Sequence, residues 1–172
     1  MKRVYNFNAG PSPMPLEVLE AMKNDLIDFK GTVMGITEIS HRSKEFQDML
    51  DETKALLREL MHLDDDYEIV FIQGGGTMQF LMTAYNFLHT RAAYADTGVW
   101  AHKARNSAAF FGEAYDANSA ADRNYSYIPD TYEVKPGTDY LYLCANNTIY
   151  GTEYWKFPKV NVPLICDMSS DI

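Results

Sequence analysis

The stretch that decides the fold reads Tyr67-Glu68-Ile69-Val70-Phe71-Ile72-Gln73-Gly74-Gly75-Gly76-Thr77-Met78-Gln79-Phe80. Its first half contains a short β-branched and aromatic run, from Ile69 to Ile72, which predicts a buried strand. The glycines that follow remove every Cβ from the next turn, and apolar residues then recur at helical spacing from Met78 onward. The order predicted for this stretch is therefore strand, glycine turn and helix.

A helix that begins at such a turn can bind an anion. Its first backbone N–H groups have no partner inside the helix, and they lie at the positive end of the helix dipole. Gly76 and Thr77 would contribute these amides, and Thr77 adds a hydroxyl. Neither a P-loop lysine nor Gly-x-Gly-x-x-Gly spacing is present, so the turn fits a single phosphate monoester. A tight turn without any ligand is the alternative.

The composition indicates a globular protein with an acidic balance. The chain has 172 residues, of which 47% are hydrophobic and 23% charged, and its net charge is −9. This charge argues against nucleic acid or an anionic membrane as the main partner. No apolar run approaches membrane-spanning length, so we expect a cytoplasmic protein. Cys144 and Cys166 lie in apolar runs, which favours reduced thiols over a disulfide, and no metal-ligand spacing is present.

Helical and strand-like segments alternate along the chain. Prolines and a glycine within residues 7–15 predict an extended arm over residues 1–15, after which Pro15 suits the first position of a helix ended by Gly31. Ser43 is expected to cap the next helix. Further strands are predicted at 91–96, 113–115, 125–128, 140–144 and 162–167, with a helix at 101–110 and a loop at 116–124. The alternation predicts an α/β domain with a mainly parallel sheet.

A series of short motifs also occurs in a fixed order. They are Asn8-x-Gly10-Pro11, Ser40-His41-Arg42-x-Lys44-Glu45-Phe46, Gly74-Gly75-Gly76-x-x-Gln79-Phe80, Gly98-x-Trp100, Asn146-x-Thr148-x-x-Gly151 and Asp167-x-Ser169-Ser170. Together they resemble the N-terminal part of the phosphoserine aminotransferases, fold-type-I enzymes that use pyridoxal phosphate (PLP), over essentially the whole chain. The resemblance implies a three-layer α/β fold in which residues 16–172 form the N-terminal part of the PLP-binding large domain.

The resemblance also implies which residues bind PLP. Gly76 and Thr77 would hold its phosphate, Trp100 would stack on its pyridine ring, and Thr148 would hydrogen-bond near the ring. Asp167 would pair with the pyridine nitrogen and keep it protonated, so that the ring can accept electrons. From the residues alone, Trp100 could be a core side chain, Thr148 an ordinary turn residue and Asp167 a cap at the end of a strand.

A substrate site and a homodimer are implied in the same way. Arg42 would bind the substrate carboxylate as a bidentate fork, with His41 near the substrate phosphate. An arginine on the surface before a helix is the alternative reading of Arg42. In this family the active site lies at a dimer interface, so His41 could serve the site of the neighbouring subunit.

The implied reaction transfers the amino group of L-glutamate to 3-phosphohydroxypyruvate, which gives O-phospho-L-serine in serine biosynthesis. A related phosphorylated oxo acid of pyridoxine biosynthesis is a second expected substrate in bacteria. The lysine that holds PLP is expected beyond Ile172, because no lysine here lies in an Ala-Gly-Gln-Lys type segment, so the chain alone should be inactive. Two alternatives stay open: an aminotransferase of the alanine–glyoxylate type, and an inactive piece that binds only partner chains or phosphate.

Overall fold

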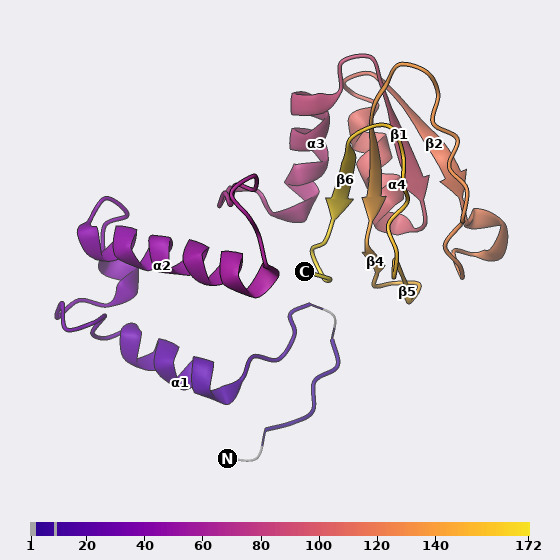
Figure 1. Cartoon of the computed structure of the whole chain (residues 1–172). Coiled ribbons are helices and arrows are strands. Elements are labelled where there is room, and N and C mark those ends of the chain that lie inside the picture. Colours follow the sequence, from indigo (N-terminus) through magenta and orange to yellow (C-terminus); the bar gives the residue numbers. More distant parts are fainter. Residues whose placement is uncertain (1–2, 9) are drawn as a thin grey trace. The chain divides into compact units, whose positions relative to one another are not determined.

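Four parallel strands organise the C-terminal part of the chain in a computed structural model that describes residues 3–8 and 10–172. They are β1 (Arg91–Asp96), β2 (Glu113–Ser119), β3 (Thr138–Cys144) and β6 (Leu164–Asp167). Their order across the sheet is β2-β1-β3-β6, and every neighbouring pair runs parallel (Figure 1). The mainly parallel α/β sheet expected from the alternation of elements is thus confirmed.

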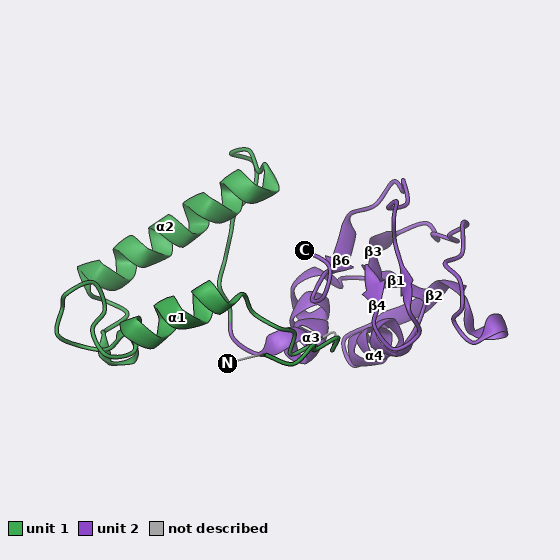
Figure 2. Cartoon of the chain, turned by 90° about the horizontal axis from the view of Figure 1, so that it is seen from below, with its two compact units in different colours: residues 1–72 green, residues 73–172 purple. Residues whose placement is uncertain are grey.

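Two helices, α3 (Gly75–Phe87) and α4 (Val99–Ala108), cover one face of this sheet (Figure 2). Side chains at alternate positions of β1 and β3 point toward them, because successive residues of a strand face opposite sides. The resulting core contains Phe80, Ala84, Leu88, Ala92, Tyr94, Ala104, Ala108, Tyr140 and Tyr142. The Tyr94 and Tyr140 hydroxyls are 2.7 Å apart, so each buried oxygen has a hydrogen-bond partner.

The opposite face of the sheet carries the other alternate set of side chains. Ala93 and Ala95 of β1 and Leu141 and Leu143 of β3 are fully buried there. Residues of irregular segments cover them, namely Ile128, Tyr132, Tyr154, Val160 and Val162. Of the three layers predicted, the described residues therefore supply the sheet, one helical layer and a cover of extended chain.

The order of the strands reverses beside β1. The chain runs from β1 through α4 to β2 on one side, and β3 then pairs with the other side of β1. The segments that follow β1 and β3 leave the sheet at the same edge, where Thr97 contacts Asn147. In open α/β sheets such a reversal is where ligands bind. A short hairpin, β4 (Asn146–Asn147) with β5 (Thr152–Glu153), forms the start of the loop that follows β3.

The N-terminal unit, Met1–Ile72, is described separately from Gln73–Ile172 (Figure 2). It contains α1 (Leu16–Asp25), the 3-10 turn η1 (Ile36–Glu38) and α2 (Lys44–Met61). The Ser43 hydroxyl accepts the Phe46 amide at 3.2 Å, which confirms the predicted cap, whereas Pro15 is the cap of α1 and not its first residue. Residues 3–8 and 10–15 form the expected irregular arm, while Met1, Lys2 and Ala9 lie outside the described residues. Nowhere in the described chain is a helix both long and apolar enough to span a membrane.

Two predicted strands are wrong. Residues 69–72 have no regular structure, and the exposed fractions of Val70, Phe71 and Ile72 are 67%, 57% and 63%. A strand needs a neighbour for its backbone groups, and residues 3–8 and 10–72 provide none. Residues 125–128 also form no strand, because the turn η2 (Ala121–Arg123) is followed by two left-handed residues, Asn124 and Tyr125. The predicted loop at 116–124 begins late, since β2 continues to Ser119.

Both cysteines are free, as predicted, and they lie on the adjacent strands β3 and β6. Burial raises the pKa of the Cys144 thiol to about 12 and that of Cys166 to about 11. Both side chains therefore carry their protons at neutral pH and behave as small apolar residues of the sheet.

Gly74 is required at the start of α3. It adopts a left-handed conformation with φ of 107°, and a Cβ there would lie 2.6 Å from Cβ of Met78. We predict that Gly74→Ala lowers the free energy of unfolding by about 1–3 kcal/mol, measured by urea denaturation. Gly76→Ala is the control, because its methyl group would meet only the Ser169 hydroxyl at 3.3 Å. Equal losses in the two variants would contradict this account.

Asp139 holds the connection between α3 and β1. One of its carboxylate oxygens accepts the backbone N–H groups of His89, Thr90 and Arg91 at 2.9, 2.6 and 3.0 Å. Partial burial alone would raise the pKa of Asp139, but the N–H donors outweigh it and the pKa lies below its ordinary value. The carboxylate therefore stabilises the fold above the ordinary pKa of about 3.9, and this stabilisation is lost as the pH falls through the lower pKa of the folded state.

We predict that Asp139→Ala lowers the free energy of unfolding by about 1 kcal/mol at pH 7, because three N–H donors lose their charged acceptor near solvent. The difference from the unsubstituted chain should shrink below about pH 4, where the carboxylate becomes protonated in both states. Denaturation curves at several pH values measure it, with Asp130→Ala, a change at an exposed carboxylate of the same unit, as the control. A difference that stays constant down to pH 2 would contradict the assigned charge effect.

Candidate active site

The first turn of α3 presents free backbone amides at the carboxyl edge of the sheet. The helix begins at Gly75, and the Met78 amide is the first to bond inside it, to the Gly74 carbonyl at 3.3 Å. The amides of Gly75, Gly76 and Thr77 precede that bond, so they are available to an anion. Both Gly76 and Thr77 are exposed to solvent. The structure thus places Gly76 and Thr77, the two residues predicted to bind phosphate, at a helix N-terminus that can bind an anion.

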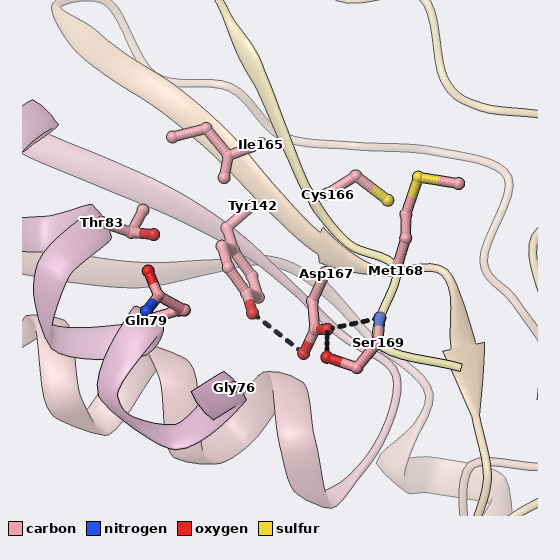
Figure 3. Close-up of a pocket in the computed structure, with 9 residues that line it drawn as sticks. All are labelled: Gly76, Gln79, Thr83, Tyr142, Ile165, Cys166, Asp167, Met168 and Ser169. Carbon is pink, nitrogen blue, oxygen red and sulfur yellow. Dashed lines mark hydrogen bonds between the residues drawn. The ribbon is translucent and has the colours of Figure 1, made fainter. Parts of the chain in front are cut away.

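Asp167 lies at the end of β6 and faces the same helix. It follows Ile165 by two residues, and Ile165 packs against the core under α3 and α4, so both side chains share that face. The Ser169 hydroxyl and amide donate to Oδ1 of Asp167 at 2.6 and 3.1 Å, and the Tyr142 hydroxyl donates to Oδ2 at 3.4 Å (Figure 3). The carboxylate is therefore held at both oxygens.

Tyr142 remains a hydrogen-bond donor to this carboxylate. Burial, and then the negative charge of Asp167, raise the pKa of Tyr142 far above its ordinary value. Its hydroxyl consequently keeps its proton at any physiological pH. Only 3% of Tyr142 is exposed, and its ring packs edge-on against Phe80 of α3. The orientation of Asp167 is thereby tied to the rigid core.

A cavity of about 220 Å³ separates the start of α3 from the end of β6. It is lined by Gly76, Gln79, Thr83, Tyr142, Ile165, Cys166, Asp167, Met168 and Ser169 (Figure 3). The Ser169 hydroxyl lies close to Gly76, at 3.3 Å from where a Cβ would be. The amide-bearing turn and the carboxylate therefore meet across one cavity.

Trp100 and Thr148 are joined directly. The indole Nε1 of Trp100, in the first turn of α4, donates to the Thr148 hydroxyl at 3.3 Å. The ring is half-buried against the helical core, and the Lys103 ammonium lies 4.7 Å from its centroid. Lys103 therefore covers one face of the indole, and the core contacts and the bond to Thr148 hold the ring in place.

The loop that carries Thr148 also contacts the segment after Asp167. The Ala145 amide donates to the Asp167 carbonyl at 2.9 Å, and the Asn146 side-chain amide donates to the Ser170 carbonyl at 3.5 Å. The loops after β3 and β6 are therefore tied together. The structure thus joins Trp100 to Thr148 by a hydrogen bond and places Gly76 and Asp167 on the wall of one cavity.

His41 and Arg42 belong to the N-terminal unit, whereas the other predicted site residues belong to Gln73–Ile172. Both are exposed and lie in the turn before α2. The Arg42 amide donates to the Ser40 hydroxyl at 3.2 Å, which stabilises this turn. Their long polar side chains are accordingly presented to solvent at the start of a helix.

Sequence reasoning missed the roles of Tyr142 and Ser169. Ser169 was part of a recognised motif, and its spacing of two from Asp167 is the signal of an Asx turn. Tyr142 was predicted only as a strand residue. Its contact with Asp167 depends on the register that pairs Tyr142 with Ile165, and no local pattern encodes that register.

Comparisons with known proteins agree with this geometry. The family model described as aminotransferase class-V matches residues 4–171. The chain belongs to the class-V aminotransferase family. It is 46% identical to a phosphoserine aminotransferase of Bacteroides thetaiotaomicron, over 98% of this chain and 47% of that protein. It is 45% identical to that of Halalkalibacterium halodurans, over 100% of this chain and 49% of that one.

Solved structures of phosphoserine aminotransferases have the same fold. One that was studied for radiation damage of its Schiff base superposes with a TM-score of 0.96 at 43% identity, covering 100% of this chain and 49% of that one. A PLP-bound enzyme from Trichomonas vaginalis superposes with a TM-score of 0.89 at 34% identity, covering 96% and 48%. The chain thus spans about half the length of the curated relatives it matches.

The bond between Trp100 and Thr148 can be tested by fluorescence. Trp155, the other tryptophan, is 88% exposed, so a Trp155→Phe background isolates the emission of Trp100. We predict that Thr148→Val increases acrylamide quenching of Trp100, because the indole N–H loses the acceptor that holds the ring. Thr148→Ser keeps a hydroxyl and should leave quenching unchanged. Identical quenching in the Val and Ser variants would argue against the bond.

Proposed function

We propose that this chain is part of a phosphoserine aminotransferase that uses PLP. The enzyme would transfer the amino group of L-glutamate to 3-phosphohydroxypyruvate and release O-phospho-L-serine. The observation that carries the proposal is the Asp167 carboxylate, held at both oxygens by Tyr142 and Ser169 across a cavity from the free amides of α3. The identity of about 45% to named phosphoserine aminotransferases supports the choice of substrate.

The residues at this edge fit PLP in size and chemistry. The amides of Gly76 and Thr77 suit its phosphate, the indole of Trp100 suits its ring, and the Thr148 hydroxyl lies beside the indole. Asp167 is the anionic partner that a pyridinium nitrogen needs. When bound, PLP supplies the electron sink that makes the bonds at the substrate Cα labile.

The protein residues would then act by position and charge. Asp167 would hold a proton on the ring nitrogen, because a fixed carboxylate beside that nitrogen raises its pKa. Tyr142 and Ser169 keep the carboxylate oriented. Arg42, as a planar fork, would bind the substrate carboxylate, and His41 would contact the substrate phosphate.

The lysine that holds PLP covalently is proposed to lie outside residues 1–172. Among the described residues, no lysine lines the cavity beside Asp167. Residues 16–172 are proposed to be the N-terminal part of the PLP-binding large domain, preceded by the arm of residues 1–15. A cytoplasmic homodimer, in which His41 serves the site of the neighbouring subunit, completes the proposal. The exposed apolar side chains of α1 and α2, such as Leu19, Met22 and Leu60, are consistent with burial in a larger assembly.

The test is an assay of the full-length protein that contains this chain, with PLP, L-glutamate and 3-phosphohydroxypyruvate. We predict glutamate-dependent formation of phosphoserine and much weaker turnover of alanine with glyoxylate. Asp167→Asn should lower kcat by about 100-fold, because a neutral amide does not stabilise a protonated ring nitrogen. Asp130→Asn makes the same change at an exposed position and should leave kcat unaltered.

Several outcomes would contradict the proposal. Absence of phosphoserine formation would refute the proposed activity. A preference for alanine and glyoxylate would instead show an aminotransferase of the alanine–glyoxylate type. Full activity of Asp167→Asn would refute the role given to that carboxylate. PLP absorbance in each variant separates loss of cofactor binding from loss of turnover.

A further inference from the structure

Asn147 is a buried polar side chain between the segments that follow β1 and β3. Only 1% of the residue is exposed, although it lies in the loop that follows β3. Its Oδ1 accepts the Thr97 hydroxyl at 3.3 Å, and its Nδ2 donates to the Thr152 hydroxyl at 3.1 Å. Both ends of the amide are thus paired inside the protein, which offsets the cost of removing it from water.

The backbone of Asn147 is held as firmly as its side chain. Its carbonyl accepts the amides of Tyr150 and Gly151 at 3.1 and 2.8 Å, which closes the turn of the β4–β5 hairpin. Thr152 stands opposite Asn147 in that hairpin, so the side-chain bond to Thr152 reinforces the same turn. Asn147 therefore forms a rigid base for the residue that follows it, Thr148.

At its other end, the hydrogen-bond network of Asn147 contacts the loop that follows β1. Thr97 is fully buried and directly follows Asp96, the last residue of β1. A Cβ on the next residue, Gly98, would lie 3.0 Å from Oδ1 of Asn147, so the Gly98 backbone packs against the asparagine side chain. Trp100 follows Gly98 by two residues and lies in the first turn of α4.

The contact between Thr97 and Asn147 therefore spans the point where the strand order reverses. Thr97 precedes Trp100 by three residues, and Asn147 directly precedes Thr148. Trp100 and Thr148 are themselves bonded at 3.3 Å. The buried contact and the exposed contact join the same two loops, so the first determines the separation at which the second can form.

We propose that Asn147, acting with Thr97, is a positioning residue that holds the Trp100 indole and the Thr148 hydroxyl at the spacing needed by the PLP ring. This inference rests on the proposed function. Asn147 touches no reacting atom, and it acts through its two neighbours. Geometry carries the argument: one buried amide ties a hairpin turn to the loop that starts α4.

The test substitutes each partner in a background in which every tryptophan of the full-length protein other than Trp100, Trp155 among them, is replaced by Phe. Asn147→Leu removes both hydrogen bonds at similar volume, and Thr97→Val removes only the hydroxyl between the loops. Thr97→Ser retains that hydroxyl and serves as the conservative rescue. Asn86→Asp, on the exposed side of α3, is the control for a change at an asparagine outside this hydrogen-bond network.

Two readouts are taken on the full-length protein that contains this chain. Acrylamide quenching of Trp100 without cofactor should rise about twofold in Asn147→Leu and Thr97→Val, because the indole loses its fixed partner. Affinity for PLP, from the same fluorescence, should weaken about tenfold in both. Thr97→Ser and Asn86→Asp should match the unsubstituted protein in both readouts.

The outcomes separate this inference from the proposed function. Unchanged quenching in Thr97→Val and Asn147→Leu, with folding verified by circular dichroism, overturns the positioning role. If the unsubstituted protein fails to bind PLP, the proposed function fails, while the quenching comparison still decides whether Asn147 sets the position of Trp100. If Asn147→Leu does not fold, the comparison of Thr97→Val with Thr97→Ser decides the question.

Discussion

The pairing of β1 with β3 is the constraint on which the candidate site depends. Because β2 lies on the far side of β1, the chain leaves β1 toward α4 on one face of the sheet and leaves β3 toward the irregular segments that cover the other face. The segments that follow β1 and β3 carry Trp100 and Thr148. Backbone hydrogen bonds between the two strands place these segments side by side, and the contact of Thr97 with Asn147 then joins them.

The core on the helical face of the sheet also holds the Asp167 carboxylate in a fixed orientation. Tyr94, Tyr140 and Tyr142 form one aromatic cluster under α3 and α4, in which polar tips are paired with one another or with Asp167. An aromatic core of this kind can bury its rings and still present a hydroxyl at the edge. The candidate site is therefore an extension of the core, and Asp167 is oriented by residues whose first role is packing.

Sequence reasoning succeeded where the deciding forces are local. The glycine turn, the Ser43 cap and the strands at 91–96 and 140–144 were predictable, because capping, glycine conformations and apolar runs act within a few residues. It failed at residues 69–72, which have the composition of a buried strand but no neighbour among the described residues of their unit. An apolar run determines that a segment favours a strand, whereas the partner that completes the strand is a property of the tertiary fold.

The sequence by itself determined the alternation of helices and strands, the glycine-rich start of α3 and the kinds of side chain available at the ends of the strands. Only the tertiary structure decided the order β2-β1-β3-β6, the register that sets Tyr142 beside Asp167, and the burial of Asn147 between two loops. The physical reason is the separation along the chain of the residues that interact. Propensity and capping are interactions between near neighbours along the chain, but strand order and register depend on contacts between residues such as Thr97 and Asn147, which lie 50 positions apart.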